Sequence, residues 1–305
     1  MDIGGTNTDA VLVDEQNKIV GAVKTTTTED ISLGFSTALK DLIEQSAIKP
    51  EQIEGVFLGT THATNAILQK KDLFRVGVIR IAGQRPETLP VAFAWPKELK
   101  DAVIGGIETI SGGLECHGGT LTDLCKEETR KAIQSLLEQA VGSIAIIGVF
   151  SPLNGDQELS VSSLVKEIAG FDFPISLSHE IGGIGFIERE NSTILNAALK
   201  QVMQKGFYSL QTACKSLNLT CPLMITQNEG SLIEIQRAID YPVLTISAGP
   251  TNSFIGGVRL AGLDNAIVVD IGGTSTDVGL VRKGFPIRSL NKSNIGGVSL
   301  NFSMP

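Results

Sequence analysis

Apolar and polar positions follow two different periods along this chain, which is the pattern of an α/β protein. Short apolar runs predict buried strands at residues 56–58, 75–81, 144–150, 174–177, 223–226 and 243–246. Apolar positions that recur every three to four residues predict helices at residues 35–47, 63–70, 121–142, 155–168 and 187–217. We therefore expect sheets that are covered by helices.

The region from residue 83 to residue 119 interrupts this pattern. It contains three prolines, the only tryptophan of the chain and three Gly-Gly pairs. Glycine and proline break regular elements, so such a composition is typical of loops. We expect a loop-rich insertion here, placed where it can cover a cleft.

Two clusters of polar residues are interpreted as structural and not as functional sites. The predicted helix 187–217 begins with four polar residues, Glu188, Arg189, Glu190 and Asn191. Charges at such a position commonly form a solvated face or local ion pairs. Cys116 and His117 are adjacent but have no further ligands at metal-site spacing, so they do not predict a metal centre.

One stretch of twelve residues occurs twice, at residues 2–13 and 270–281, and nine of the twelve positions are identical. Each copy reads as a strand, a tight turn with two glycines and a second strand. Glycine lets the backbone approach a ligand closely, and the hydroxyl and N–H groups of such a turn can surround phosphate oxygens. One copy alone would also suit an ordinary hairpin. The pair predicts two phosphate-binding hairpins that face each other across a cleft.

Length and composition limit the other choices. The chain has 305 residues, which is enough for two domains, and a net charge of −8 with scattered Lys and Arg, which argues against nucleic acid as a partner. There is no apolar run of the ~18–20 residues that a membrane span requires, and no signal peptide pattern. The four cysteines form no CxxC pair, which favours reduced thiols and a cytoplasmic protein.

The duplicated hairpin resembles those of the actin, heat-shock chaperone and sugar-kinase superfamily. More closely, the chain resembles the hydantoinase A / 5-oxoprolinase family. The stretches that carry this likeness are GTTHATNAIL (59–68), ERENSTILNA (188–197), ITQNEGSL (225–232), SAGPTNSFIGG (247–257) and the second hairpin. The chain departs from the family pattern at Glu229, where a glycine is common, and at Thr251-Asn252, where the family has GPAGG-like text.

The resemblance implies an actin-like (ribonuclease H-like) ATPase fold with two lobes around a nucleotide cleft. It divides the sequence into an N-terminal region, 1–178, and a hydantoinase A region, 179–305, that we expect to be truncated at its C-terminal end. It implies hydrolysis of a cyclic amide, of the hydantoin or 5-oxoproline type, through ATP-dependent phosphorylation of the amide oxygen. ATP and Mg²⁺ are the implied cofactors, and a hydantoinase B-type subunit is the implied partner, with a homo-oligomer as a further option.

Three alternatives stay open at this point. Relatives in the resembled family serve as ATP-handling subunits of acetone and acetophenone carboxylases. A small-molecule kinase of the same superfamily would transfer phosphate to a stable hydroxyl group. A nucleotide-switch module would hydrolyse ATP slowly and respond to a protein partner instead of a small amide.

The resemblance also implies roles for individual residues. Asp2 and Asp270 would bind Mg²⁺ and position water, with Asp277 as a further metal ligand. The residues implied to contact phosphate or adenosine are Gly4, Gly5, Thr6, Thr8, Gly249, Pro250, Gly256, Gly257, Gly272, Gly273, Thr274 and Thr276. The catalytic candidates on the substrate side are Thr60, His62, Asn65 and Arg189, although Thr60 and its neighbours equally suit a helix N-cap.

Overall fold

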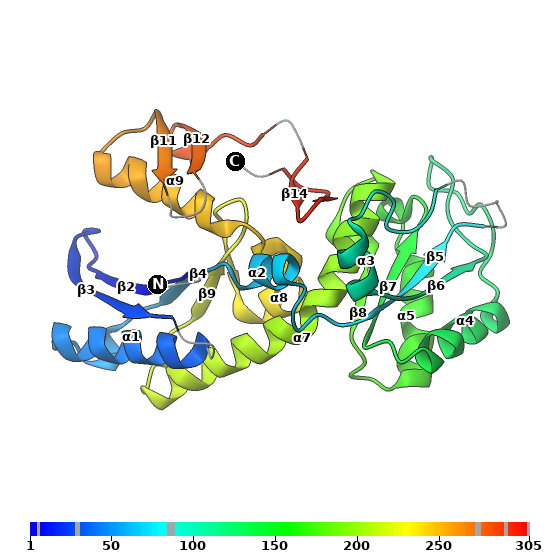
Figure 1. Cartoon of the computed structure of the whole chain (residues 1–305), viewed down its shortest axis with the longest axis horizontal. Coiled ribbons are helices and arrows are strands. Elements are labelled where there is room, and N and C mark those ends of the chain that lie inside the picture. The colour runs from blue at the N-terminus through cyan, green and yellow to red at the C-terminus, as the bar shows by residue number, and fades with distance from the viewer. Residues whose placement is uncertain (5–6, 28–30, 84–88, 272–275, 290–291, 304–305) are drawn as a thin grey trace. The chain divides into compact units, whose positions relative to one another are not determined.

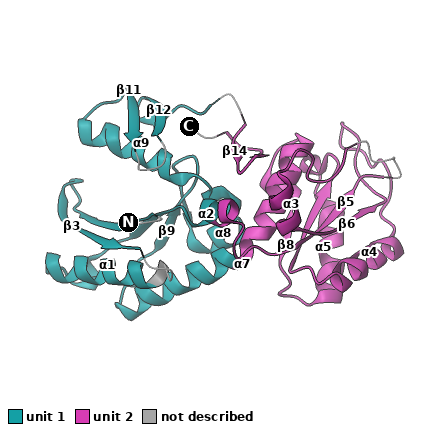
Figure 2. Cartoon of the chain, in the orientation of Figure 1, with its two compact units in different colours: residues 1–65, 202–290, 304–305 teal, residues 66–201, 291–303 magenta. Residues whose placement is uncertain are grey.

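The computed structural model describes residues 1–4, 7–27, 31–83, 89–271, 276–289 and 292–303 (Figure 1). They form two compact units (Figure 2): unit 1 takes residues 1–65 and 202–290, and unit 2 takes residues 66–201 and 291–303. The chain passes between the units inside helix α2 (His62–Gln69) and inside helix α7 (Phe186–Ser216). Each unit therefore takes segments from both sides of residue 178, and the division of the sequence into regions 1–178 and 179–305 stays a prediction.

A six-stranded mixed sheet with the order β10-β9-β4-β1-β2-β3 forms the centre of unit 1. Its strands are β1 (Asp2–Ile3), β2 (Asn7–Val13), β3 (Ile19–Thr26), β4 (Val56–Thr60), β9 (Leu223–Thr226) and β10 (Leu232–Glu234). Strands β1, β2 and β3 form an antiparallel meander, whereas β1, β4 and β9 run parallel. The short β1 thus joins the antiparallel and parallel parts of the sheet.

Helix α1 (Ile31–Ser46) packs on β2 and β3 through the apolar stripe that the sequence predicts. Phe35, Leu39 and Leu42 of this stripe are buried. Ala47, the last predicted member, is exposed and has a left-handed backbone with φ 52°. The helix therefore ends just before the last residue of the predicted pattern.

The second copy of the duplicated stretch forms a hairpin of β11 (Ala266–Ile271) and β12 (Thr276–Arg282), extended by β13 (Phe285–Pro286). Asp270 pairs with Asp277 across it, just as Asp2 pairs with Asp9 in the β1–β2 hairpin. The repeat in the sequence is thus a repeat in structure and register. Helix α9 (Ala248–Ala261) covers one face through Phe254, which lies against Gly279 of β12.

One predicted strand of unit 1 is wrong. Residues 243–246 were expected to form a buried strand, but Pro242–Thr245 forms a 3-10 helix after helix α8 (Ile235–Asp240). Pro242 fixes φ and lacks the N–H group that a strand ladder would use. Val243 and Thr245 are nevertheless buried. The apolar residues at 243–246 thus correctly predicted a buried segment but not its secondary structure.

Unit 2 is built on a four-stranded parallel sheet with the order β6-β5-β7-β8. Its strands are β5 (Val76–Ile81), β6 (Ile104–Ile110), β7 (Ser143–Gly148) and β8 (Ile175–Leu177). Every residue of β5 and β7 is buried, as expected for central strands of a parallel sheet. Helices α4 (Lys126–Glu138) and α5 (Asp156–Ala169) pack against each other and supply the apolar core together with these strands.

The loop-rich insertion expected at residues 83–119 is wrong in its central part. Helix α3 (Lys97–Val103) leads directly into β6, which pairs with β5 as a member of the sheet. The Gly105-Gly106 pair lies within β6 because α4 and the loop after it approach closely. A Cβ at Gly105 would lie 2.7 Å from Cγ1 of Val141, and one at Gly106 would lie 2.8 Å from Cδ2 of Leu136.

The remaining regular elements are short. They are helix α6 (Ser178–Ile181), the hairpin of β14 (Asn294–Ile295) and β15 (Val298–Ser299), and 3-10 helices at Pro50–Gln52 and Ser151–Leu153. Among the described residues, no helix combines the length and the apolar character that crossing a membrane requires.

The contact between α9 and β12 yields a stability prediction. In Gly279→Ala, the new Cβ would lie 2.3 Å from ring atoms of Phe254, so the helix has to move away from the hairpin. We expect a loss of about 1–3 kcal/mol in the free energy of unfolding, which urea denaturation followed by circular dichroism measures. Gly256→Ala is the matched control, because it lies in α9 with open space around it and should be neutral or slightly stabilising. Equal stability of Gly279→Ala and the wild type would contradict this packing.

Candidate functional site

Three polar side chains of unit 1 meet at Gly59, near the carboxyl ends of the parallel strands β1, β4 and β9. A Cβ on Gly59 would lie 2.7 Å from Nδ2 of Asn252, 3.0 Å from Oδ1 of Asp2 and 3.5 Å from Oγ1 of Thr226. Asn252 donates a hydrogen bond of 3.1 Å to Thr226, which donates one of 2.9 Å to the carbonyl of Leu58. The absence of a side chain at Gly59 therefore allows these groups to converge at the edge where α/β sheets commonly bind ligands.

Negative charge gathers at the same edge. Desolvation raises the pKa of the Asp2 carboxyl, although its side chain still reaches solvent. The charges of Asp9 and Asp270 raise this pKa further, while the terminal ammonium group opposes them. Asp2 and Asp270, the first residues of the two repeats, are thus close enough to repel each other. A divalent cation with phosphate ligands would relieve this repulsion, so the donor set suits Mg²⁺.

Hydrogen bonds hold the described residues on either side of the first turn. Gly4 N–H donates to the carbonyl of Asn7 at 3.0 Å, and Thr27 Oγ1 donates to the carbonyl of Gly4 at 2.9 Å. Thr8 is fully buried and its hydroxyl lies 3.1 Å from that of Thr27. Thr8 thereby supports the turn from inside the hairpin. Gly5, Thr6, Gly272, Gly273 and Thr274, which we predicted as phosphate contacts, lie outside the described residues.

In the second hairpin, Asp270 and Asp277 form a cross-strand pair and both are half-buried, whereas Thr276 is exposed. In α9, Gly256 faces open space, but a Cβ on Gly257 would lie 3.2 Å from Cγ1 of Val268 in β11. Gly257 therefore permits close packing of α9 on β11. The adenosine contacts predicted for Gly249, Pro250, Gly256 and Gly257 stay predictions.

The predicted substrate residues Thr60, His62 and Asn65 cluster at the start of α2. Thr60, the last residue of β4, is buried, and its hydroxyl accepts a hydrogen bond of 3.1 Å from the N–H group of His62, the first residue of α2. This bond satisfies one of the N–H groups that a helix start leaves without an intrahelical partner. Asn65 Nδ2 donates to Thr61 Oγ1 at 3.2 Å. These contacts give Thr60 and Asn65 a structural role in unit 1, and a catalytic role stays a prediction.

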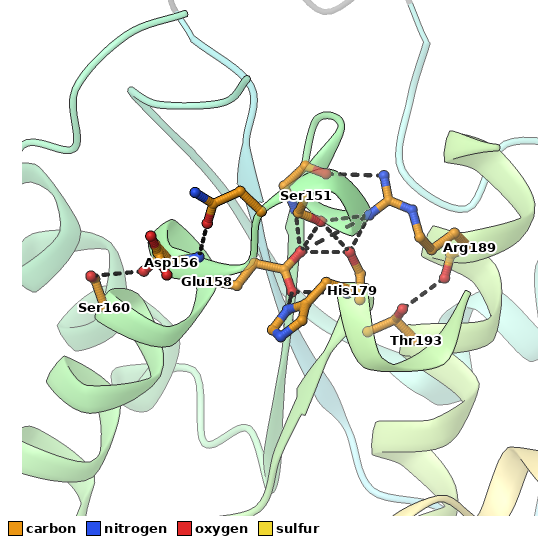
Figure 3. Close-up of polar contacts among 10 residues, drawn as sticks. Ser151, Asp156, Glu158, Ser160, His179, Arg189 and Thr193 are labelled. Atoms are coloured by element: carbon orange, nitrogen blue, oxygen red, sulfur yellow. Dashed lines mark hydrogen bonds and ion pairs between the residues drawn. The ribbon is translucent and has the colours of Figure 1, made fainter. Parts of the chain in front are cut away.

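Arg189, the fourth substrate candidate, lies in unit 2 within a buried polar cluster (Figure 3). The cluster consists of Ser151, Glu158, Ser178, His179 and Arg189. The guanidinium group of Arg189 donates to the hydroxyl groups of Ser151 and Ser178 and to the carbonyl of Gly148. Its Nη1 lies 4.0 Å from Oε1 of Glu158, and both side chains are completely buried.

The solvated face that we expected at the start of α7 is therefore wrong. Arg189, Glu190 and Asn191 are all buried, and their partners are far away in the sequence. Arg80 of β5 binds both carboxylate oxygens of Glu190, at 2.6 and 2.8 Å. The indole Nε1 of Trp95 donates to Asn191 at 2.8 Å. The first turns of α7 thus carry the polar core of unit 2.

The charges of the cluster depend on its hydrogen bonds. Burial opposes the charged form of Glu158, but hydrogen bonds from His179, Ser151 and Ser178 outweigh it and lower the pKa of this carboxyl. The hydrogen bond to Glu158 is also the main reason why the pKa of His179 is raised. Among the described residues, there is no group of three or more His, Cys, Asp or Glu side chains that could hold a metal ion.

The repeat in the sequence drew attention to Asp2, Asp270 and Asp277. The sequence analysis did not name Thr226 or Asn252 as site residues. Thr226 ends a predicted strand, which was an available signal. Asn252 stands where the chain departs from the resembled family, and only the fold shows that it reaches the Asp2 edge.

Two family models match this chain. One, described as the hydantoinase/oxoprolinase N-terminal region, matches residues 1–169, and the other, described as hydantoinase/oxoprolinase, matches residues 189–304.

Individual relatives agree with these matches. The chain is 27% identical over 308 residues to the caprolactamase subunit alpha of Pseudomonas jessenii, covering 93% of this chain and 43% of the relative. It is 25% identical over 314 residues to the acetophenone carboxylase gamma subunit of Aromatoleum aromaticum, covering 92% and 42%. The nucleotide-free structure of acetone carboxylase superposes with a TM-score of 0.80 at 21% identity, covering 99% of this chain and 46% of that one, which establishes a common fold. The chain spans less than half the length of these relatives.

The buried cluster predicts how the stability of unit 2 depends on pH. A raised pKa at His179 stabilises the fold fully below pH 6.5, and this contribution is lost as the pH rises through the raised value. A lowered pKa at Glu158 stabilises the fold above pH 4.5, and this contribution is lost as the pH falls through the lowered value. We therefore expect the highest stability between pH 4.5 and 6.5, measured by urea unfolding with the fluorescence of Trp95, the only tryptophan.

Glu158→Gln should flatten this profile and cost about 3–5 kcal/mol at its maximum, because it removes the carboxylate that faces the buried guanidinium group of Arg189. Glu167→Gln on the same helix is the control. It breaks an exposed pair with Arg130 at 2.8 Å and should cost less than about 1 kcal/mol. A wild-type profile that stays flat from pH 4 to 8 would contradict the assignment.

Proposed function

The chain belongs to the hydantoinase/oxoprolinase family, and we propose that it binds ATP with Mg²⁺ to drive the opening of a cyclic amide of the hydantoin or 5-oxoproline type. The observation that carries this proposal is the pair of hairpins in identical register, with Asp2 and Asp270 close enough to influence each other. Such paired carboxylates beside Gly-rich turns suit a metal-bound triphosphate.

The architecture of unit 1 supports the actin-like (ribonuclease H-like) part of the proposal. A three-stranded antiparallel meander followed by parallel strands, in the order β3-β2-β1-β4-β9, is the arrangement expected for one lobe of such an ATPase. The β11–β12 hairpin would begin the equivalent sheet of the other lobe, because it repeats β1–β2 in sequence and register. Acetone carboxylase, which shares the fold of this chain, carboxylates acetone in an ATP-dependent reaction.

The chemistry follows from the weakness of the substrate. An amide carbon is a poor electrophile, and bound ATP supplies a phosphoryl group that makes the amide oxygen a better leaving group. Phosphoryl transfer depends mainly on positioning and on neutralising charge. Asp2 and Asp270 would hold the metal, and the turn N–H groups would hold the phosphates. The hydrogen-bonded side chains of Asn252 and Thr226 would line the site beside Gly59.

The names of the relatives suggest two related reactions, the opening of a cyclic amide and the carboxylation of a ketone. Caprolactamase is named for a cyclic amide, and acetophenone carboxylase for a ketone, so a carboxylase subunit is the second candidate function. Both relatives are named as subunits, which supports a partner subunit for this chain, and the resemblance suggests one of the hydantoinase B type. A small-molecule kinase would leave a stable phosphorylated product.

The test is release of phosphate from Mg-ATP by the chain together with its candidate partner, with and without 5-oxoproline, hydantoin or a simple ketone plus bicarbonate. We expect stimulation by a cyclic amide and a loss of about 10²-fold or more in kcat/KM for Asp270→Asn. Asp264→Asn is the matched control, because this aspartate lies in the loop before β11 with an exposed side chain.

Each outcome separates the candidates. Stimulation by a ketone with bicarbonate alone would favour the carboxylase, and a phosphorylated product that accumulates would favour the kinase. ATP hydrolysis that is indifferent to every small molecule and to Asp270→Asn would overturn the proposal.

A further inference from the structure

The buried cluster of unit 2 contains an ordered histidine that the ATP-dependent reaction above does not use. We propose that His179, oriented by Glu158, is the proton acceptor of a separate ligand site on unit 2, which takes a small neutral molecule through an N–H or O–H group. The proposal depends on the geometry of unit 2 alone. Its outcome is therefore independent of the nucleotide site in unit 1.

Glu158 fixes the imidazole ring of His179 from two directions. Its Oε2 lies 2.7 Å from Nδ1 and accepts a second hydrogen bond, of 3.1 Å, from the backbone N–H group of the same residue. Its Oε1 accepts hydrogen bonds from Ser151, Ser178 and the N–H group of Gly148, at 2.6, 2.6 and 2.7 Å. An ionised carboxylate only accepts hydrogen bonds, so Nδ1 carries the proton and a neutral ring presents the lone pair of Nε2.

The charge of the cluster is balanced without a proton on Nε2. Arg189 already faces Glu158, and Arg80 already binds Glu190, so both buried carboxylates have a guanidinium partner. A neutral His179 is therefore compatible with the buried surroundings. Its pKa is raised by Glu158 and Glu180 and is lowered by burial and by Arg189, and the net rise makes Nε2 a stronger proton acceptor than an ordinary histidine.

Figure 3 shows the imidazole ring of His179 beside the carboxylate of Glu158. The His179 side chain is 19% exposed, and no other described residue forms a hydrogen bond with Nε2. Gly155 creates the space for the ring, because a Cβ there would lie 2.6 Å from Nε2. Glu158, in contrast, is completely sealed from solvent. This division, with a buried carboxylate behind a partly exposed imidazole, is the usual arrangement of a histidine that transfers protons.

The position in the sheet favours a ligand site as well. His179 is the second residue after β8, and Ser151 lies three residues after the end of β7. Ligands of parallel α/β sheets bind beyond the carboxyl ends of the strands. Phe150, between β7 and Ser151, has a left-handed backbone with φ 55°, a conformation that costs energy for a residue other than glycine and is concentrated at functional sites.

The proposed step is a single proton transfer. The ligand first donates a hydrogen bond from its N–H or O–H group to Nε2. When the proton moves, the bond between it and the ligand nitrogen or oxygen breaks, and the electron pair stays on the ligand. The new Nε2–H bond makes the ring an imidazolium, which Glu158 stabilises across the hydrogen bond to Nδ1.

Nuclear magnetic resonance of the ¹⁵N-histidine-labelled chain, without nucleotide, tests this proposal, because the sequence has only three histidines. His62→Gln and His117→Gln assign the signals. Wild-type His179 should show the Nδ1–H form above its pKa, and Glu158→Gln should lower that pKa towards about 6.5. The probes are 2-pyrrolidinone, which has an N–H group, and N-methyl-2-pyrrolidinone, which has none. Only 2-pyrrolidinone should shift Nε2.

Gly155→Ala provides a second variant if Glu158→Gln does not fold. Its backbone suits alanine, with φ −84° and ψ −1°, but the new Cβ displaces the imidazole ring. We expect this variant to lose the response to 2-pyrrolidinone. Equal shifts with both probes, no shift with either, or an Nε2–H form in the wild type would each overturn the proposal and leave His179 with a structural role.

Discussion

The hydrogen bonding of β1 between β2 and β4 is the constraint on which the candidate nucleotide site depends. Asp2 pairs with Asp9 on its antiparallel side and with Gly59 on its parallel side, so one short strand sets the position of the first hairpin relative to the parallel strands. Because β4 carries glycine at this point, Asp2 can approach Asn252 and Thr226. A side chain at residue 59 would separate the groups that the sheet has brought together.

Unit 2 solves a different physical problem, which is how to place charges inside an α/β core. Among its described residues, the buried acidic and basic side chains occur as matched pairs, Arg80 with Glu190 and Arg189 with Glu158. Serine hydroxyl groups and backbone N–H groups satisfy the remaining lone pairs of Glu158. Burial of charge is tolerated only with such partners. The position of the start of α7 is therefore determined by buried hydrogen bonds and ion pairs as much as by its apolar face.

The sequence was informative wherever a local pattern decides the structure. The repeat predicted both hairpins, and the spacing of apolar residues predicted α1 and α7, because periodicity reflects which face is buried. It failed where a distant partner decides. Glu190 looks like a solvated helix residue, since its partner Arg80 is 110 residues away. The glycines of β6 look like a loop, since the helix that packs on them comes later in the chain. For the candidate site, the repeat predicted the equivalent positions of Asp2 and Asp270 in the two hairpins, and their metal-binding role stays a prediction. The convergence on Gly59 required the fold.

The aromatic ring of Phe186 has a consequence for how this protein can change during evolution. The ring lies 5.6 Å from the guanidinium carbon of Arg80 and 5.5 Å from that of Arg189, so it contacts both buried ion pairs. A substitution at any one of these three positions alters the surroundings of the other two. The three should therefore be inherited as a group, and a lineage that replaces one of them should carry compensating changes at the others.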